Sequence, residues 1–228
     1  MIRPTLIRKR QVWLPTVWGW LFLAVICFAA ALAAARNLHG YLAQNAPVGA
    51  PILVVEGWLD PDDGLDDAVA LFRSGGYSRV VTTGGPLEQW PGVEQPATFA
   101  ERAANYLVRK GLSKESVTAV PTPGTNEERT YLSAVTVREW AAQSGVKVQG
   151  LDILSSGTHA RRSRLLYELA FGPSVKVGVY AARFPDYEPD RWWRTSLGAK
   201  DVLVQAIGLL WVKCFFWPSP PPDRVSQR

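Results

Sequence analysis

The sequence predicts an α/β fold: a Rossmann-like three-layer sandwich with a mostly parallel five-stranded sheet, preceded by one N-terminal transmembrane helix. Short apolar runs alternate with helical patterns from residue 51 to residue 180, as in strands that pair in parallel across intervening helices. Residues 11–35 carry no charge, and at about 1.5 Å per residue a helix of that length spans the ~30 Å core of a bilayer. The length of 228 residues, with 47% hydrophobic side chains, fits an anchor plus one domain and argues against disorder.

The net charge of +5 is a property of the N-terminus. Residues 1–47 hold five of the 25 basic side chains and no acidic one, so residues 48–228 balance 20 basic against 20 acidic. Because this part is neutral, it lacks the electrostatics of nucleic-acid binding, and we expect no nucleic-acid partner. Cys27 and Cys214 lie in apolar runs near opposite ends of the chain and predict no framework disulfide.

The N-terminal segment predicts a single-pass anchor in the cytoplasmic (inner) membrane. Its basic residues precede Trp13, Trp18 and Trp20, which fall where an interfacial aromatic belt belongs, so the N-terminus is expected in the cytoplasm and the domain outside. A cleaved signal peptide is an alternative because Ala33–Ala35 is a small-residue site. A buried core helix is another, although the run lacks a polar face. The expected organisation is a basic cytoplasmic tail (1–10), an anchor (11–36), a linker (37–50), an α/β domain (51–217) and a flexible tail (218–228).

Each expected strand is an apolar run that ends at turn residues. The first, Pro51–Gly57, is continuous, as in a strand buried on both faces. Asp60-Pro61 marks the start of a helix that ends near Gly75-Gly76, and Thr125–Glu128 matches a capping box. The other strands are expected near residues 78–83, 117–120, 146–154 and 174–180, and the other helices near 96–110, 125–144 and 159–171.

Ligands of such sheets bind at the carboxyl ends of the strands, where the strand order reverses. The candidate site is therefore the set of segments that follow the strands: Glu56-Gly57, Thr83-Gly84-Gly85, residues 121–129 and Ser155–His159. The sequence contains no G-x-G-x-x-G after the first strand, no P-loop motif and no G-x-S-x-G elbow, which argues against nicotinamide dinucleotides, P-loop nucleotides and an α/β-hydrolase. No cofactor is specified.

The segment Ser155–Arg164 predicts an anion site. It places His159, Arg161, Arg162 and Arg164 in the first turns of a helix, where the helix dipole disfavours cations by about 0.3–1 kcal/mol each. Ser156 or Thr158 can cap this helix, and a phosphate or carboxylate bound there would use its free N–H groups. The alternative is that the arginines are solvated or paired with acids and that His159 is a structural histidine.

Other candidate residues have two interpretations each. His159 is the only histidine in residues 48–228, so a multi-histidine metal site is excluded, and Glu56, Asp60, Asp62 and Asp63 are more typical of a helix start than of a carboxylate metal site. Gly84-Gly85 fits a tight turn or a close approach of ligand to backbone. Glu101 is a candidate acid/base or a surface charge, whereas Glu127 and Glu128 fit capping residues better than catalysts.

These motifs resemble the ElyC/SanA/YdcF family of bacterial proteins over about residues 51–180. The resemblance is carried by Gly57, Thr83-Gly84-Gly85, Glu101–Ala103, Thr130, Ala134 and Ser155–Arg162, in which Ser156, His159 and Arg162 match and Thr158 replaces an aromatic residue. A membrane-tethered branch is similar also at Val55–Trp58 and Arg191–Arg194. The resemblance implies a Rossmann-like fold, a role in envelope or peptidoglycan biogenesis for some members, and S-adenosylmethionine binding for one.

The leading hypothesis is a membrane-anchored extracytoplasmic protein that binds a phosphorylated, polyprenyl-linked or small-molecule intermediate of the cell envelope. The expected ligand-binding residues are Glu56, Gly57, Thr83, Gly84, Gly85, Thr130, Ser156, His159, Arg161 and Arg162, with His159 and Glu101 as acid/base candidates and no metal. The alternatives are a non-catalytic module for a nucleotide-like ligand such as S-adenosylmethionine, and a structural scaffold. Arg191–Arg194 fits a lid or surface packing, and Val202–Trp217 is expected to dock on the sheet or to touch the membrane interface.

Overall fold

A computed structural model describes residues 13–89, 96–125, 127–183 and 187–218, apart from the side chains of Asp62 and Asp63. The chain divides into two compact units, residues 1–37 and residues 38–228, and each is described by itself. The predicted basic tail (1–10) and residues 219–228 of the predicted flexible tail lie outside the described residues.

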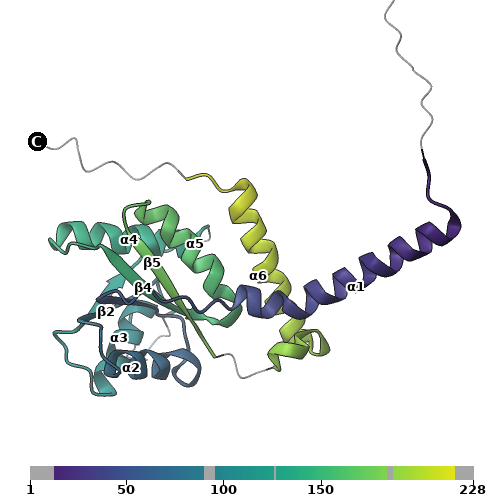
Figure 1. Ribbon diagram of the computed structural model, residues 1–228. Helices are drawn as coiled ribbons and strands as arrows, with labels where there is room; N and C mark the ends of the chain where they lie inside the picture. Colours follow the sequence, from purple (N-terminus) through teal and green to yellow (C-terminus); the bar gives the residue numbers. More distant parts are fainter. Residues whose placement is uncertain (1–12, 90–95, 126, 184–186, 219–228) are drawn as a thin grey trace, which may run out of the picture. The chain divides into compact units, whose positions relative to one another are not determined.

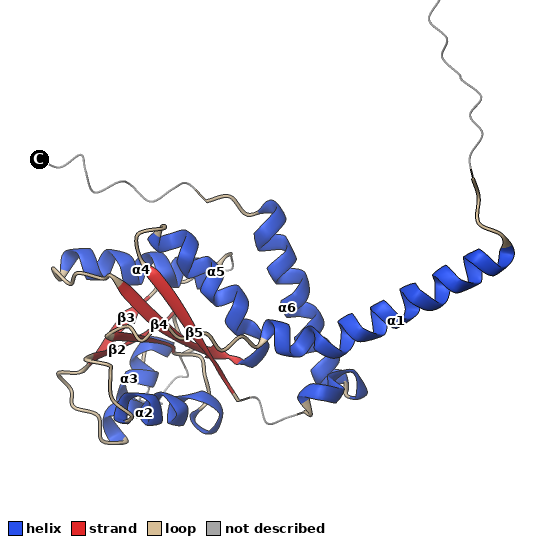
Figure 2. Ribbon diagram, viewed as in Figure 1, coloured by secondary structure: helices blue, strands red, loops and turns tan. Residues whose placement is uncertain are grey.

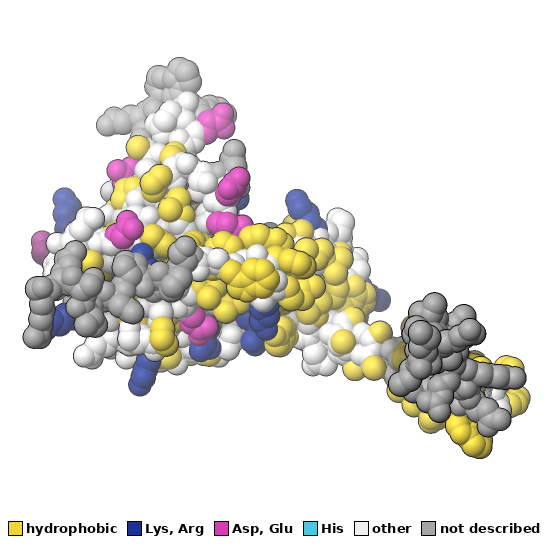
Figure 3. Space-filling view, turned by 90° about the horizontal axis from the view of Figure 1, so that it is seen from above, with side chains coloured by type: hydrophobic (Ala, Val, Ile, Leu, Met, Phe, Trp, Pro, Cys, Tyr) yellow, Lys and Arg dark blue, Asp and Glu magenta, His cyan; other side chains and the backbone are white. Residues whose placement is uncertain are grey.

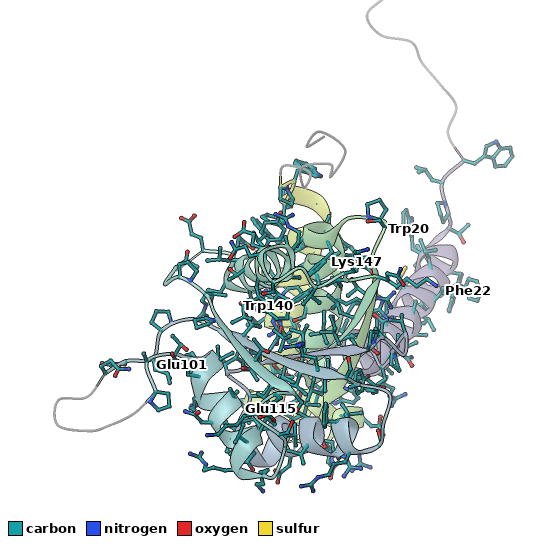
Figure 4. All side chains as sticks on the ribbon, turned by 90° about the vertical axis from the view of Figure 1, so that its left-hand side faces the viewer. Trp20, Phe22, Glu101, Glu115, Trp140 and Lys147 are labelled. Atoms are coloured by element: carbon teal, nitrogen blue, oxygen red, sulfur yellow. The ribbon has the colours of Figure 1, made fainter. Side chains whose placement is uncertain are left out.

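The first unit is dominated by helix α1 (Val17–Leu42), whose last turn belongs to the second unit. The helix is long and apolar enough to cross a membrane, and none of its most apolar stretch is buried within the protein. Trp20 and Phe22 point away from the helix, with relative exposures of 54% and 69% (Figure 4). A helix that is apolar all round is normally covered, so a bilayer is the environment that this composition fits.

The second unit has the predicted α/β architecture. Five parallel strands lie in the order β3-β2-β1-β4-β5, with helices on both faces of the sheet (Figures 1 and 2). The strands are β1 (Ile52–Glu56), β2 (Arg79–Gly84), β3 (Val117–Pro121), β4 (Gly150–Ser156) and β5 (Lys176–Ala182). The order reverses between β1 and β4, so the switch point at which such folds bind ligands lies between the ends of these two strands.

Alternation along β1 assigns its side chains to the two layers. Ile52 and Val54 pack in a core with helices α4 (Arg129–Gln143) and α5 (Ala160–Phe171). Leu53 and Val55 pack in the opposite core. That core contains α2 (Asp66–Arg73) and α3 (Phe99–Arg109). Because successive side chains point to opposite faces, Glu56 at the end of β1 faces the α4 and α5 layer.

Two helix starts differ from the sequence prediction. The capping box forms at α3, where Thr98 Oγ1 accepts from the Glu101 N–H and Glu101 Oε2 accepts from the Thr98 N–H. At α4 the N-cap is Glu128, which has a left-handed backbone and no capping side chain, so the predicted Thr125–Glu128 capping box is wrong. The π-helical turn η1 (Pro61–Leu65) precedes α2, and the Asp60 side chain makes no capping hydrogen bond.

The segment predicted as a linker, residues 37–50, is largely part of the folded second unit. Ala46 exchanges backbone hydrogen bonds with Val179 of β5, and the Asn45 side chain accepts from the Ala181 N–H. The buried carboxylate of Asp152 on β4 accepts from the N–H groups of Val48 and Ala50. This segment therefore binds along the edge strand rather than serving as a loose tether.

The C-terminal helix α6 (Ser196–Phe215) completes the unit. It packs on α5 and on the 3₁₀ turn η2 (Gly157–His159), with Val202, Leu209 and Val212 buried. Helix α6 therefore packs on other helices, whereas the sequence predicted that it packs on the sheet. The preceding turn η3 (Pro189–Arg194) buries Trp192 and exposes 40% of Trp193, away from the cavity described below, so the aromatic pair packs on the surface rather than forming a lid.

Candidate functional site

A cavity of about 860 Å³ lies at the carboxyl ends of β1, β2 and β3 and beside the start of α5. This is the edge at which the sheet order reverses, and the volume lies within the range of small-molecule sites. Seven of the predicted ligand residues line it: Glu56, Thr83, Gly84, Gly85, Thr130, His159 and Arg162. The cavity and these seven residues therefore share one edge of the sheet.

Glu56 forms the buried acidic floor of the cavity. Only 3% of the residue is exposed, and its carboxylate accepts hydrogen bonds from Ser155 Oγ (2.8 Å) and Ser163 Oγ (2.6 Å). Hydrogen bonds from hydroxyl groups stabilise a carboxylate that burial would otherwise penalise. Glu56 is thus held in place by its own protein partners, with one oxygen 3.9 Å from His159 Nε2.

His159 is held between two helices. Its Nδ1 receives N–H groups of Arg162 at 3.1 and 3.3 Å, and Gln205 Oε1 of α6 lies 3.0 Å from the same nitrogen. Since a guanidinium can only donate, Nδ1 is an acceptor and the proton of the neutral ring is on Nε2. The Gln205 side chain thus lies beside the same ring nitrogen that accepts from Arg162.

The Nε2–H of His159 faces the cavity and Thr130 Oγ1 at 3.3 Å. Burial lowers the pKa of His159, the Arg162 charge adds to this, and the Glu56 carboxylate opposes it. The result is a neutral imidazole at neutral pH that presents a hydrogen-bond donor to the cavity. That arrangement suits the binding of an acceptor better than it suits removal of a proton from Thr130, which would need an unprotonated Nε2.

Arg162 is a half-buried cation in the cavity wall with no carboxylate of the described residues within 4.0 Å of its guanidinium. Burial lowers the pKa of Arg162, although an arginine remains charged. Gly208 of α6 makes room for the group: a Cβ there would lie 3.1 Å from Arg162 Cζ and would overlap Nη1. Arg129, also in the cavity wall, is likewise without a carboxylate at ion-pair distance among the described residues.

Backbone and hydroxyl donors add to these cations. Phe99 opens α3, Arg129 and Thr130 open α4, and His159 precedes α5, so three helix N-termini border one cavity. Helix N-termini carry positive potential and free N–H groups. Thr83 Oγ1 is buried at the cavity wall and has no hydrogen-bond partner among the described residues, which leaves a polar atom for a ligand to satisfy.

The formal charges at the cavity nevertheless balance, because Glu56 and Glu128 line it together with Arg129 and Arg162. Glu56 accepts one serine hydroxyl on each oxygen, whereas neither arginine has a carboxylate within 4.0 Å among the described residues. The arrangement therefore offers an anion-binding side near Arg162, His159 and the helix starts, and a carboxylate that accepts hydroxyl groups.

Four predicted site residues lie outside the cavity wall. Gly57 packs against the backbone, since a Cβ there would lie 2.8 Å from Thr83 O, and Ser156 is buried at the end of β4. Arg161 donates to the Tyr41 carbonyl and stacks over the Tyr41 ring. Glu101 uses its carboxylate as a cap for α3, which leaves it no acid/base role at this cavity (Figure 4).

The sequence reasoning missed the contribution of α6. Gln205, Trp211 and Val212 line the cavity, and Gly208 accommodates Arg162. Trp58, which follows β1, places its ring edge-on to His159 with centroids 5.7 Å apart. The sequence does contain a signal for this contribution: Gln205 and Gly208 interrupt the apolar run 202–212. A polar residue and a glycine in an otherwise apolar helix indicate a side that faces a polar site.

Gly84 and Gly85 differ in how much space surrounds them. A Cβ at Gly84 would lie 2.7 Å from Phe99 Cβ, so the close packing of β2 on α3 requires the missing side chain. A Cβ at Gly85 would make only ordinary contacts, the nearest at 3.6 Å to Thr122 Oγ1. Gly85 is therefore the position at which a ligand can approach the backbone. Among the described residues, no group of three or more His, Cys, Asp or Glu side chains is arranged to hold a metal ion.

The chain has a distant structural similarity to a solved protein. No protein-family model matches the chain, and no curated protein sequence matches it. Among solved structures, the chain is similar to a bifunctional NMN adenylyltransferase/ADP ribose pyrophosphatase from Francisella tularensis, with 13% sequence identity and a TM-score of 0.41. The match covers 75% of this chain and 58% of that one, so the chain spans little more than half of that neighbour's length.

Proposed function

We propose that this protein is a membrane-anchored binding protein for a phosphorylated, lipid-linked intermediate of the cell envelope, held in the cavity at the sheet edge. The observation that carries the proposal is the half-buried Arg162 guanidinium, which faces the cavity without a carboxylate partner among the described residues. A half-buried cation without an ion-pair partner is costly, and a bound phosphate would reduce that cost. Arg129, the His159 Nε2–H and Thr83 Oγ1 supply further donors.

The apolar part of the cavity wall supports a ligand that also carries a lipid. Trp58, Phe99, Leu166, Trp211 and Val212 line it together with the polar groups. Polyprenyl phosphates combine an anionic head with an apolar chain, so both kinds of wall would be used. The residues of the ElyC/SanA/YdcF resemblance that line the cavity, among them Gly84, Thr130, His159 and Arg162, support membership of that family and an envelope role.

The proposed location is the cytoplasmic membrane, with the N-terminus in the cytoplasm and the domain outside. The long apolar helix α1 and the basic residues before it support this orientation. A C-terminal alkaline phosphatase fusion should be active and a C-terminal green fluorescent protein fusion dark. The reverse pattern would place the domain in the cytoplasm and remove the envelope ligand from its reach.

Binding is tested with the full chain in detergent or nanodiscs. Polyprenyl phosphate should raise the unfolding temperature and the uncharged polyprenol should not, because a ligand at one hundred times its Kd stabilises by about 2.7 kcal/mol. Arg162→Ala should abolish the shift. The matched control is Arg164→Ala, which removes the same charge from the same helix at an ion pair with Glu168 outside the cavity. Equal shifts for polyprenol and polyprenyl phosphate would refute the proposal.

Catalysis is a separate question with its own assay. Release of inorganic phosphate from polyprenyl pyrophosphate is compared between wild type and His159→Ala. The Nε2–H tautomer allows His159 to donate a proton or a hydrogen bond to the ligand, and equal rates would exclude a catalytic role for it.

A nucleotide-like ligand is the second candidate, and the placement of Trp58 favours it. The Trp58 ring is 41% exposed and lines the cavity beside the buried Glu56 carboxylate, a pairing suited to a stacked base and a hydroxylated ribose. S-adenosylmethionine and adenine nucleotides in the same thermal-shift assay distinguish the two ligand classes. Stabilisation by them that survives Arg162→Ala would favour this candidate.

A further inference from the structure

The outer face of α6 is apolar, and its side chains are exposed in the part of the second unit that the structure describes. We define this face by Leu203, Val204, Ile207, Leu210, Trp211 and Phe215, whose exposures run from 40% for Trp211 to 67% for Ile207 and Phe215. From Leu203 to Phe215 every exposed side chain except Lys213 is apolar. Hydrophobic side chains gather over this part of the molecule in the space-filling view (Figure 3).

The inner face of α6 makes contacts that fix how the helix is rotated about its axis. Val202, Leu209 and Val212 are buried against the unit, and the polar side chains Asp201 and Gln205 also point inward. Asp201 accepts from Thr158 and Tyr187, and Gln205 contacts His159. At about 100° per residue, the outer face covers the side of the helix that these contacts leave free. A helix that is apolar on both sides is normally covered on both.

The position of α6 identifies what covers it. Lys213 Nζ lies 3.4 Å from the Tyr41 hydroxyl, so the C-terminal half of α6 touches the last turn of α1 within the second unit. Tyr41 follows Arg36, the first charge after the apolar run, by five residues, or about 7.5 Å along a helix. The contact point therefore lies within one to two turns of where the apolar helix ends. Trp211, Phe215 and Lys213 are also the residue types typical of a membrane interface.

We infer that the outer face of α6 lies on the lipid bilayer, with its apolar side chains in the interfacial region and Lys213 toward the head groups. The chain holds this face at the membrane through α1, so the contact adds to an existing anchor instead of having to recruit the protein from solution. Because Trp211 belongs both to this face and to the cavity wall, the cavity is next to the lipid surface.

The inference is tested with the native cysteine Cys214, which is exposed on α6 and lies on the same side of the helix as Leu210 and Phe215. The full chain with Cys27→Ser carries a nitroxide at Cys214 and is reconstituted in phosphatidylethanolamine/phosphatidylglycerol vesicles. Collision rates with oxygen, which concentrates in lipid, and with a water-soluble nickel chelate are measured by electron paramagnetic resonance. The control is a nitroxide on the Lys114→Cys variant of a chain without native cysteines, since Lys114 is exposed on the loop before β3.

The expected result is an oxygen-to-nickel collision ratio several-fold higher at Cys214 than in the Lys114→Cys control. Ready collision with nickel at both sites would show a face in water and overturn the inference. Low collision with both reagents at Cys214 would show cover by protein, either a second copy or α1, and would overturn it too. The measurement uses no ligand, so its outcome is independent of the proposed phosphate binding.

Discussion

Gly208→Ala tests whether α6 positions the cation of the site. A Cβ at this position would lie 3.1 Å from Arg162 Cζ and 3.2 Å from Cδ and would overlap Nη1, whereas ordinary contacts begin near 3.4 Å. The arginine is flexible at its far end, so it should move rather than the helix. The hydrogen bonds from Arg162 to His159 Nδ1, at 3.1 and 3.3 Å, should break with that movement.

The expected magnitudes separate this effect from misfolding. Alanine in place of a glycine within a helix adds about 0.5–1 kcal/mol of helix preference, so the unfolding temperature should hold or rise. Loss of a charged hydrogen bond to the ligand should weaken phosphate binding by about 1.5–3 kcal/mol, roughly 10- to 150-fold in Kd. Gly40→Ala is the control, because it makes the same change in α1 with nothing within 4 Å of the new Cβ.

The assay is a titration of imidazole signals by nuclear magnetic resonance in the full chain. The chain has two histidines, so His39 serves as the internal reference for His159. Because the Arg162 charge lowers the pKa of His159, displacement of Arg162 should move that pKa upward, and the signal of a fixed Nε2–H tautomer should be lost. An unchanged His159 titration together with unchanged ligand affinity would refute the coupling between α6 and the site.

Three further predictions concern single groups. Ser163→Ala should destabilise the fold by about 1–3 kcal/mol in urea unfolding, because it removes the 2.6 Å hydrogen bond to buried Glu56. A change under about 0.5 kcal/mol would mean that this hydrogen bond does not stabilise the fold. Glu101→Ala removes the capping box of α3, so it should lower the free energy of unfolding by about 0.5–2 kcal/mol and leave ligand affinity unchanged. A loss of affinity without a loss of stability would show that Glu101 takes part in ligand binding. The pKa of His159 is lowered in the folded state, so as the pH falls the unfolded chain takes up a proton at this histidine before the folded chain does. The free energy of unfolding should therefore decrease as the pH drops below 6.5. His159→Gln should weaken this pH dependence, and an unchanged pH dependence would assign it to other groups.

The sheet and its edge were predictable because their signals are local. The apolar runs bounded by turn residues predict all five strands, and parallel pairing alone then brings Glu56, Thr83 and His159 to one edge. The capping box was misassigned because Thr125-x-x-Glu128 and Thr98-x-x-Glu101 share one pattern. The left-handed backbone of Glu128 and the bond from Thr125 Oγ1 to the Glu127 carbonyl, which decide between them, are set by the loop conformation.

The contacts of the three arginines on α5 could not be predicted from the sequence, for a different reason. Arg161, Arg162 and Arg164 are close neighbours on α5, yet they contact Tyr41, His159 and Glu168 respectively. Which of the three enters the cavity depends on α6 and on the end of α1, and these packing contacts join residues far apart in the chain. Helical spacing limits the choice to a face, and tertiary contacts select Arg162.

One helix, α6, thus borders both the cavity and the exposed apolar face of the second unit. Gln205 and Gly208 on the inner side of α6 fix His159 and Arg162, while Ile207 and Leu210, one or two residues away, form the outer face. A rigid helix cannot tilt on one side without moving the other. If the outer face rests on lipid, a shift of α6 on the bilayer would displace the Gly208 backbone against the Arg162 guanidinium and so move this cation in the cavity wall. Phosphate affinity should then depend on whether the full chain is in a bilayer or in detergent, and Gly208→Ala should reduce that dependence, because Arg162 no longer packs against Gly208.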